Sequence, residues 1–350
     1  MMVLYDNMLT MVILVWDALL PEIAESIEDR NKIFFLGGVV GAIGGIPVIF
    51  TLTIVNAGLI AFQLFSGIIA IISAIILVMA ATKLRERPEL HQEMNLPGWF
   101  KALKQCLRSR SFVFFTLYRF FRVINETITF SFMFVYALLF IEGFETILII
   151  IFGLGGIIGQ WIYLRLSEKK EMQVLILQGR TIEISIAVIA FLISMLKGTE
   201  IIWFGLLIVK IILGEYSVFV NPYLLLITDE DEMKYNTRRE GMYLGTNAIF
   251  NKIAESIGPI LAVTVLLLFG FMQNAPKGYI QSDSAIIGIK FLLFIVPSII
   301  DVIGMIALRF YPIKGNYIKE LKRYIEETHK EKLIEYEKTK ELKKRKYNPD

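Results

Sequence analysis

Long apolar runs separated by short polar segments make up most of this sequence. Each run has about 20 to 30 residues, enough for a helix to cross a hydrocarbon core of roughly 30 Å. The pattern predicts about nine transmembrane helices, at residues 1–21, 33–55, 58–82, 111–140, 144–165, 174–196, 200–227, 241–270 and 285–309. The run at the start of the chain is the weakest of them. We therefore expect an all-α membrane protein that crosses the cell membrane several times.

Two polar stretches divide the chain. Residues 83–110 are basic, contain Pro88 and Pro97, and include an amphipathic patch that begins at Trp99, which predicts a linker with a helix at the membrane surface. The charged C-terminal region is expected to form a solvated helix that packs weakly on the same side. The predicted organisation is, in order, a partial N-terminal bundle of three helices at 1–82, the linker at 83–110, a six-helix bundle at 111–309 and a tail helix at 310–350.

The lysines and arginines predict the orientation. Alternate loops, at 22–32, 83–110, 165–173 and 228–240, hold fifteen of them, whereas the opposite loops hold only Lys197 and Lys277. Because short cytoplasmic loops are enriched in basic residues, the basic side and the C-terminal tail are expected to be cytoplasmic. An odd number of spans then places the N-terminus outside.

Composition narrows the function classes. Hydrophobic residues make up 55% of the chain, above the usual share in soluble domains. A single cysteine, Cys106, excludes a disulfide framework and a cysteine-rich zinc site and is expected to be a buried or lipid-facing thiol. The two histidines, His91 and His329, lie in polar stretches. We expect no metal site, no cofactor and no nucleic acid partner; the expected partners are the lipid bilayer and a small-molecule substrate.

Charged residues inside the predicted spans are the candidate functional groups, because a charge in the membrane is costly unless it is paired or faces a cavity. Arg119, Arg122 and Glu126 share one face of span 111–140, and the last two are spaced as an ion pair. Two further candidate pairs are spaced three residues apart, Arg180 with Glu183 and Lys252 with Glu255. Lys210 and Glu215 lie on different sides of one predicted helix, and Asp301 lies in the last span.

Each of these sets has a structural and a functional interpretation. Paired charges can fix the register of helices without touching a substrate, and this is the main alternative for Arg180 and Glu183. The candidate substrate or cavity residues are Lys252, Glu255, Arg119, Arg122, Glu126, Lys210 and Glu215. The aromatic residues between Phe112 and Phe121 are expected to face lipid, and the glycine run 37–45 is expected to be a helix-packing face.

One stretch has a specific resemblance. Residues 229–255 combine an acidic segment, the sequence Arg238-Arg239-Glu240-Gly241 and a lysine, Lys252, fourteen residues after the first arginine. This order is similar to the junction of helices 10 and 11 in the glycoside-pentoside-hexuronide:cation symporters, the melibiose-carrier branch of the major facilitator superfamily. The segment 18–30 and the sequence around Pro312 also resemble that family, in its order, beginning at its fourth helix.

The resemblance implies a major facilitator-type bundle whose nine helices are equivalent to helices 4–12. It further implies secondary active transport of a small solute, a sugar or related glycoside first of all, by alternating access coupled to Na⁺ or H⁺. In such symporters the residue matching Lys252 lies in the central cavity near the cation and sugar sites. The implied cytoplasmic gate charges are Arg30, Asp229, Arg238, Arg239 and Glu240.

Departures from the family keep other functions open. Ile13, Gly38 and Ser217 occupy positions where the family has, respectively, an acidic sugar-binding residue, an arginine and a tryptophan, and its cation-site aspartates belong to a helix with no counterpart here. One alternative is an N-terminally truncated, non-transporting paralogue or partner subunit. We expect an upstream segment, a subunit or a second copy to complete the first bundle, without which the chain would not transport. A membrane enzyme acting on lipid-linked substrates is less favoured.

Overall fold

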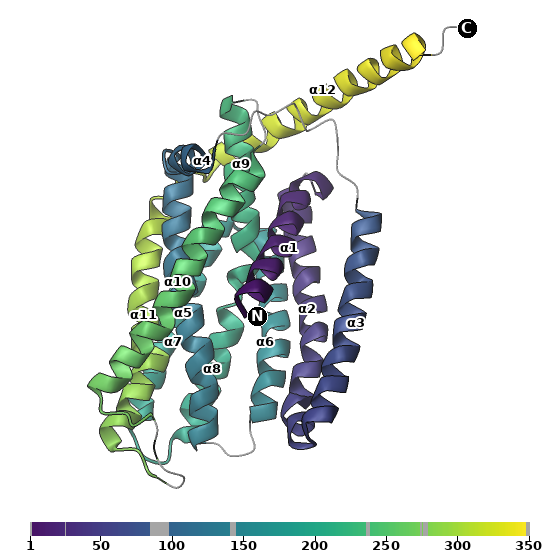
Figure 1. Ribbon diagram of the computed structural model, residues 1–350. Helices are drawn as coiled ribbons and strands as arrows, with labels where there is room; N and C mark the ends of the chain where they lie inside the picture. The colour runs from purple at the N-terminus through teal and green to yellow at the C-terminus, as the bar shows by residue number, and fades with distance from the viewer. Residues whose placement is uncertain are drawn as a thin grey trace.

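The computed structural model describes residues 2–24, 26–84, 98–140, 145–235, 239–273, 275 and 279–347. Within these ranges all regular secondary structure is helical. The elements are α1 (Met2–Ile23), α2 (Ile27–Asn56), α3 (Leu59–Lys83), α4 (Trp99–Cys106), α5 (Arg110–Phe140), α6 (Glu145–Ser167), α7 (Met172–Ser194), α8 (Glu200–Leu213), the 3-10 helix η2 (Tyr216–Phe219), α9 (Val220–Tyr235), α10 (Glu240–Leu268), α11 (Asp283–Arg309) and α12 (Asn316–Tyr347). Figure 1 shows one bundle of long helices with α4 and α12 at the same end, which we call the α12 end.

The core of the bundle is built around α11. This helix packs against α5 and α7, while α10 packs against α5 and α8 against α7. The contacts bury Ile289, Leu292 and Phe294 together with Trp203 of α8, whose ring meets that of Phe294 edge to face. Because Trp and Phe bury large apolar areas, such pairs contribute strongly to the cohesion of the core.

The first three helices are less enclosed. α2 packs against α6, α1 packs against α10, and α3 lies mainly against α2 at the outer edge of the bundle (Figure 1). No residue of α3 is buried. Its apolar side chains therefore face outward, as expected of a helix whose solvent is lipid.

The structure interrupts the helix that was expected over the predicted span 200–227. α8 ends at Leu213, whose carbonyl accepts a hydrogen bond of 2.7 Å from the Tyr163 hydroxyl. A side chain at Gly159 of α6 would collide with the carbonyl of Ile212, so glycine lets the two helices approach at the break. Pro222 lies in the first turn of α9, where its missing N–H costs no helical hydrogen bond.

Four helices of the described residues are long and apolar enough to cross a membrane: α3, α7, α10 and α11. By contrast α8 has only 14 residues, and α5 carries four charged residues along its length. The fold class is that of an all-α, multi-pass membrane protein. The total of nine spans, their orientation and the division into two bundles stay predictions.

The tail helix α12 packs more firmly than the sequence analysis expected. Leu321 and Ile325 are buried in the same apolar cluster as Tyr311, and α12 contacts α9. Glu232 of α9, fully buried, lies 2.6 Å from Lys332 and 3.3 Å from His329. Since buried charges need partners, these contacts tie the tail to the bundle.

The linker is only partly described, because 85–97 lies outside the described residues together with His91. Its C-terminal part forms α4, as the amphipathic patch predicts. The Cys106 side chain is buried against α10, and burial raises the pKa of its thiol. This is the buried thiol that the sequence suggested.

Candidate functional site

A charged cavity of about 350 Å³ lies within the bundle between α5, α7 and α8. At a rise of 1.5 Å per residue, Arg122 lies about 18 Å along α5 and Arg180 about 12 Å along α7, both counted from the α12 end. Both depths are well inside a hydrocarbon core of roughly 30 Å. The lining residues are Arg122, Asn125, Glu126, Thr129, Arg180, Glu183, Lys210, Ile211, Gly214 and Glu215.

Arg180 connects two helices at one side of this cavity. Its Nη1 donates to Glu183 Oε2 at 3.0 Å on its own helix and to Asp301 Oδ2 at 2.9 Å on α11. The predicted spacing of Arg180 and Glu183 is therefore a real contact. Asp301, for which the sequence suggested no partner, joins α11 to the site.

A second arginine cluster comes from α5. Arg122 Nε donates to Glu126 at 2.5 Å, and Arg119 lies 3.8 Å from the same carboxylate. Of the two arginines only Arg122 lines the cavity. One carboxylate thus serves two guanidinium groups, which leaves an excess of positive charge on α5.

Tyr216 of η2 sits between the two clusters. The guanidinium carbon of Arg122 lies 5.0 Å from the centre of its ring and that of Arg180 lies 4.8 Å away, both within cation–π range. The Tyr216 hydroxyl donates to Glu183 at 3.2 Å. Tyr216 is not among the sequence-predicted site residues, because an unbroken helix was expected over 200–227; in the structure it lies in η2, directly after the break.

Lys210 and Glu215 find separate partners, as their positions on one helix required. Lys210 Nζ lies 4.0 Å from Glu183, and Glu215 accepts a hydrogen bond of 3.2 Å from Gln160 of α6. In the described part of the chain, neither Lys210 Nζ nor Arg122 Nη1 has a hydrogen-bond partner, although both nitrogen atoms are buried. Two strong donors are therefore available to a ligand in the cavity.

The charges that line the cavity balance at their ordinary protonation states. Three are positive and three are negative: Arg122, Arg180 and Lys210 against Glu126, Glu183 and Glu215. Just outside the lining, Arg119 and Asp301 offset each other as well. Because an uncompensated charge at this depth is costly, the balance lets the helices hold eight charged groups together.

Lys252 and Glu255 do not belong to this cavity. Lys252 Nζ lies 3.0 Å from Glu255, so the predicted pair is formed, but the two side chains are 42% and 48% exposed on the surface of α10. The structure thus places the sequence-predicted candidates in two groups, one at the cavity and one pair on α10.

The predicted gate charges lie at the α12 end. Arg30 of α2 is fully buried and donates to Asp229 of α9 at 2.6 Å and 3.3 Å, across 199 positions of sequence. Arg239 instead binds Asp231, at 2.7 Å and 2.8 Å. Glu240 is buried at the start of α10, and Arg238 lies outside the described residues. Of the five residues, the structure brings Arg30 and Asp229 together directly.

No group of three or more histidine, cysteine, aspartate or glutamate side chains that could hold a metal ion occurs in the described ranges. The arrangement can instead recognise a ligand through charge-assisted hydrogen bonds from arginine and lysine and through acceptance by glutamate. Its groups have the chemistry to bind and orient a polar molecule.

Comparison with known proteins gives two matches. The family described as MFS/sugar transport protein matches residues 1–315 of this chain. A stretch of 104 residues is 29% identical to an uncharacterized symporter of Synechocystis sp. (strain ATCC 27184 / PCC 6803 / Kazusa), covering 29% of this chain and 19% of that protein. The chain thus spans about a fifth of the length of this relative.

Proposed function

This chain belongs to the MFS/sugar transport protein family, and we propose that it is a secondary active transporter that moves a small polar solute, a sugar or related glycoside first of all, by cation-coupled alternating access. Family membership points to transport and away from catalysis. The choice of solute class and the coupling to a cation are our own inferences, and they start from the cavity between α5, α7 and α8.

We infer a sugar-like solute because one cavity holds both hydrogen-bond donors without a partner and carboxylates that can accept. Arg122 Nη1 and Lys210 Nζ can donate to hydroxyl or carboxylate oxygens, while Glu126 can accept from hydroxyl groups. A sugar offers several groups that both donate and accept, so it fits both kinds of partner. The volume, about 350 Å³, lies in the range of small-molecule sites.

The charge balance supports coupling. A Na⁺ ion or a proton that binds a cavity carboxylate adds one positive charge to a set of three cations and three anions. If that carboxylate is Glu183, its attraction for Lys210 at 4.0 Å weakens and the lysine becomes free to bind the solute. Cation binding and solute binding would then favour one another, as symport requires.

The ion pair between Arg30 and Asp229 supports a gate at the α12 end. It joins α2 to α9 and is shielded from solvent. Removing one partner of such a buried pair usually lowers stability by about 3–5 kcal/mol. In our proposal this pair and the neighbouring pair Arg239–Asp231 hold the bundle closed at that end and separate when it opens.

Counterflow of labelled sugars into liposomes that contain the complete transporter, with its first bundle completed as the sequence leads us to expect, tests the proposal and locates the site. Lys210→Gln should reduce uptake roughly 10- to 100-fold, because a charge-assisted hydrogen bond contributes about 1.5–3 kcal/mol. Lys252→Gln should abolish uptake if the exposed pair on α10 lines the solute pathway. Lys330→Gln on the exposed tail is the matched control and should leave uptake unchanged.

The pattern of losses discriminates between the two candidate regions. If Lys252→Gln reduces uptake and Lys210→Gln does not, the solute site lies at the surface of α10 and not in the cavity. If neither variant changes uptake, neither lysine takes part in transport. A solute that emerges chemically altered would contradict transport and favour a membrane enzyme.

A further inference from the structure

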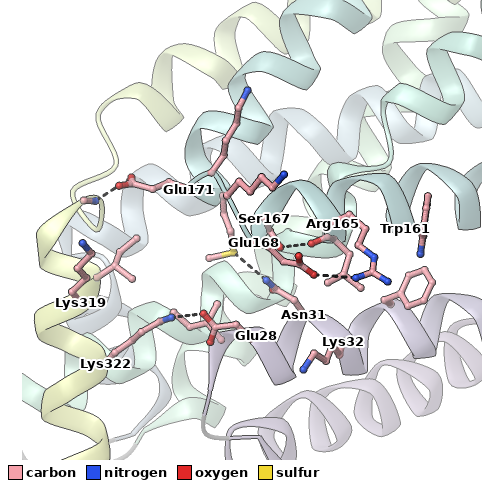
Figure 2. A pocket seen from close by; sticks show the side chains of 18 residues that line it. Glu28, Asn31, Lys32, Trp161, Arg165, Ser167, Glu168, Glu171, Lys319 and Lys322 are labelled. Atoms are coloured by element: carbon pink, nitrogen blue, oxygen red, sulfur yellow. Dashed lines mark hydrogen bonds and ion pairs between the residues drawn. The ribbon is translucent and has the colours of Figure 1, made fainter.

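A second, larger cavity of about 1000 Å³ opens at the α12 end and shares no lining residue with the charged cavity. Figure 2 shows that its walls come from three places: the start of α2, the end of α6 with the turn that follows, and the first turns of α12. Nothing in the transport proposal uses it. Six basic side chains line it: Lys32, Arg165, Lys169, Lys170, Lys319 and Lys322.

The carboxylates of this cavity do not cancel its positive charge. Three glutamates line it, and each is already engaged: Glu28 with Lys322 at 2.7 Å, Glu168 with Arg165 at 3.3 Å, and Glu171 with the backbone N–H of Gly315 at 3.2 Å. Asp29, just outside, lies 3.2 Å from Lys32. Six cations against four anions leave an excess of two positive charges.

Three of the six basic residues, Lys169, Lys170 and Lys319, form no ion pair within the described parts of the chain, and all three are exposed. Lys170 donates a hydrogen bond of 3.1 Å to the side chain of Gln178, which leaves Lys169 and Lys319 as the lysines open to an anion. They approach the cavity from different elements, one from the turn after α6 and one from α12. An anion bound between them would connect the two elements and neutralise positive charge that no ion pair neutralises.

One wall of the cavity is apolar. Phe35 of α2 and Trp161 and Leu164 of α6 line it, and α2 packs against α6. The Trp161 side chain is exposed, with the Arg165 guanidinium 5.9 Å from its ring. An exposed tryptophan beside a basic residue is typical of the depth at which lipid headgroups meet acyl chains.

We propose that this cavity binds one anionic phospholipid, with its phosphate between Lys169 and Lys319 and an acyl chain along the Phe35–Trp161 wall. Basic pockets between membrane helices bind such headgroups through charge. A soluble anion would use the lysines but would leave the apolar wall uncovered. Because the site joins α2 to α6 and α12, the bound lipid would hold these elements together.

The experiment uses the full chain, purified in detergent, with phosphatidylglycerol as the anionic probe and phosphatidylcholine as the zwitterionic one. Retained lipid is counted by native mass spectrometry, and the melting temperature is measured with and without each lipid. We expect one tightly retained phosphatidylglycerol, a higher melting temperature with it, and no comparable effect of phosphatidylcholine.

Paired variants separate this site from general attraction to basic protein. Lys169→Gln with Lys319→Gln should weaken phosphatidylglycerol binding roughly 25-fold, at about fivefold per lysine. Lys330→Gln with Lys338→Gln removes the same charge from exposed positions of α12 outside the cavity and should leave binding intact. All four lysines are exposed, so the lipid-free melting temperatures should match that of the native chain.

Three outcomes would overturn the proposal. Equal retention of phosphatidylglycerol and phosphatidylcholine would show that lipid charge does not matter. Equal loss of phosphatidylglycerol binding in the two double variants would show that the lipid is attracted non-specifically to basic protein. Inorganic phosphate that displaces the lipid at similar concentration would make the cavity an anion site without an acyl chain. None of these outcomes depends on sugar transport, so the two proposals can fail independently.

Discussion

Helices α3 and α11 are similar in length and apolarity but differ in what surrounds them. Both are long and apolar enough to cross a membrane, yet 61% of the most apolar stretch of α11 is buried inside the protein and none of that of α3 is. α11 packs against α5 and α7 and carries Asp301, whereas α3 carries a charge only in its last turn. Apolarity therefore predicts that a helix crosses the membrane, and contacts decide whether protein or lipid surrounds it.

The largest expected effect on stability comes from removing the Asp301 carboxylate of α11. Asp301→Ala removes the acceptor that lies 2.9 Å from Arg180 and should lower the free energy of unfolding by about 3–5 kcal/mol, the usual cost of breaking a buried ion pair. Unfolding in detergent, followed by circular dichroism, measures it. A loss under 1 kcal/mol would mean that Glu183 alone satisfies Arg180.

A balanced variant tests whether charge is the cause. Arg180→Gln combined with Asp301→Asn removes both charges and keeps hydrogen-bonding groups of similar size. It should recover a large part of the stability that Asp301→Ala loses. If it is as unstable as the single variant, packing around Asp301 matters more than its charge.

An intermediate effect is expected from apolar truncation on the two helices. Ile289→Ala on α11 should cost about 2–5 kcal/mol, because this side chain is fully buried and its removal leaves a cavity. Ile72→Ala on α3 should cost less than about 1 kcal/mol, since that side chain is 52% exposed and lipid refills the space. Equal losses for the two variants, measured by the same unfolding assay, would show that α3 is covered by protein.

Local spacing predicted the local part of the site and little more. The pairs Arg122–Glu126 and Lys252–Glu255 follow from three- and four-residue spacing on a helix. The contact between Arg180 and Asp301 joins residues 121 positions apart, and no periodicity in a single sequence encodes it. The helix positions were predicted for the same reason as the local pairs, because apolar length is a local property.

Burial against protein was the part that the sequence could not predict. Phe112, Phe115 and Tyr118 were expected to face lipid and are almost fully buried. In the glycine run 37–45 only Gly38 meets a neighbour, the Gln160 side chain, while a side chain at Gly41 would meet nothing. Lipid and protein interior are similarly apolar, so the same residues suit either one.

The smallest effect, and the only pair with opposite signs, comes from glycine. At Gly288 of α11 an added Cβ would lie 2.6 Å from the Cβ of Phe269, so Gly288→Ala forces Phe269 to shift. Overpacking costs about 1–3 kcal/mol, and better helix propensity returns up to about 1 kcal/mol, which leaves a net loss near 1 kcal/mol. At Gly67 of α3 nothing lies within 4 Å, so Gly67→Ala keeps the propensity gain and should raise the melting temperature slightly.

The two variants make the same chemical change in two equally apolar helices, and the difference between them measures only what surrounds each helix. Stabilisation at both positions would mean that α11 can move away from Phe269 at no cost, and destabilisation at both would place a protein surface against α3.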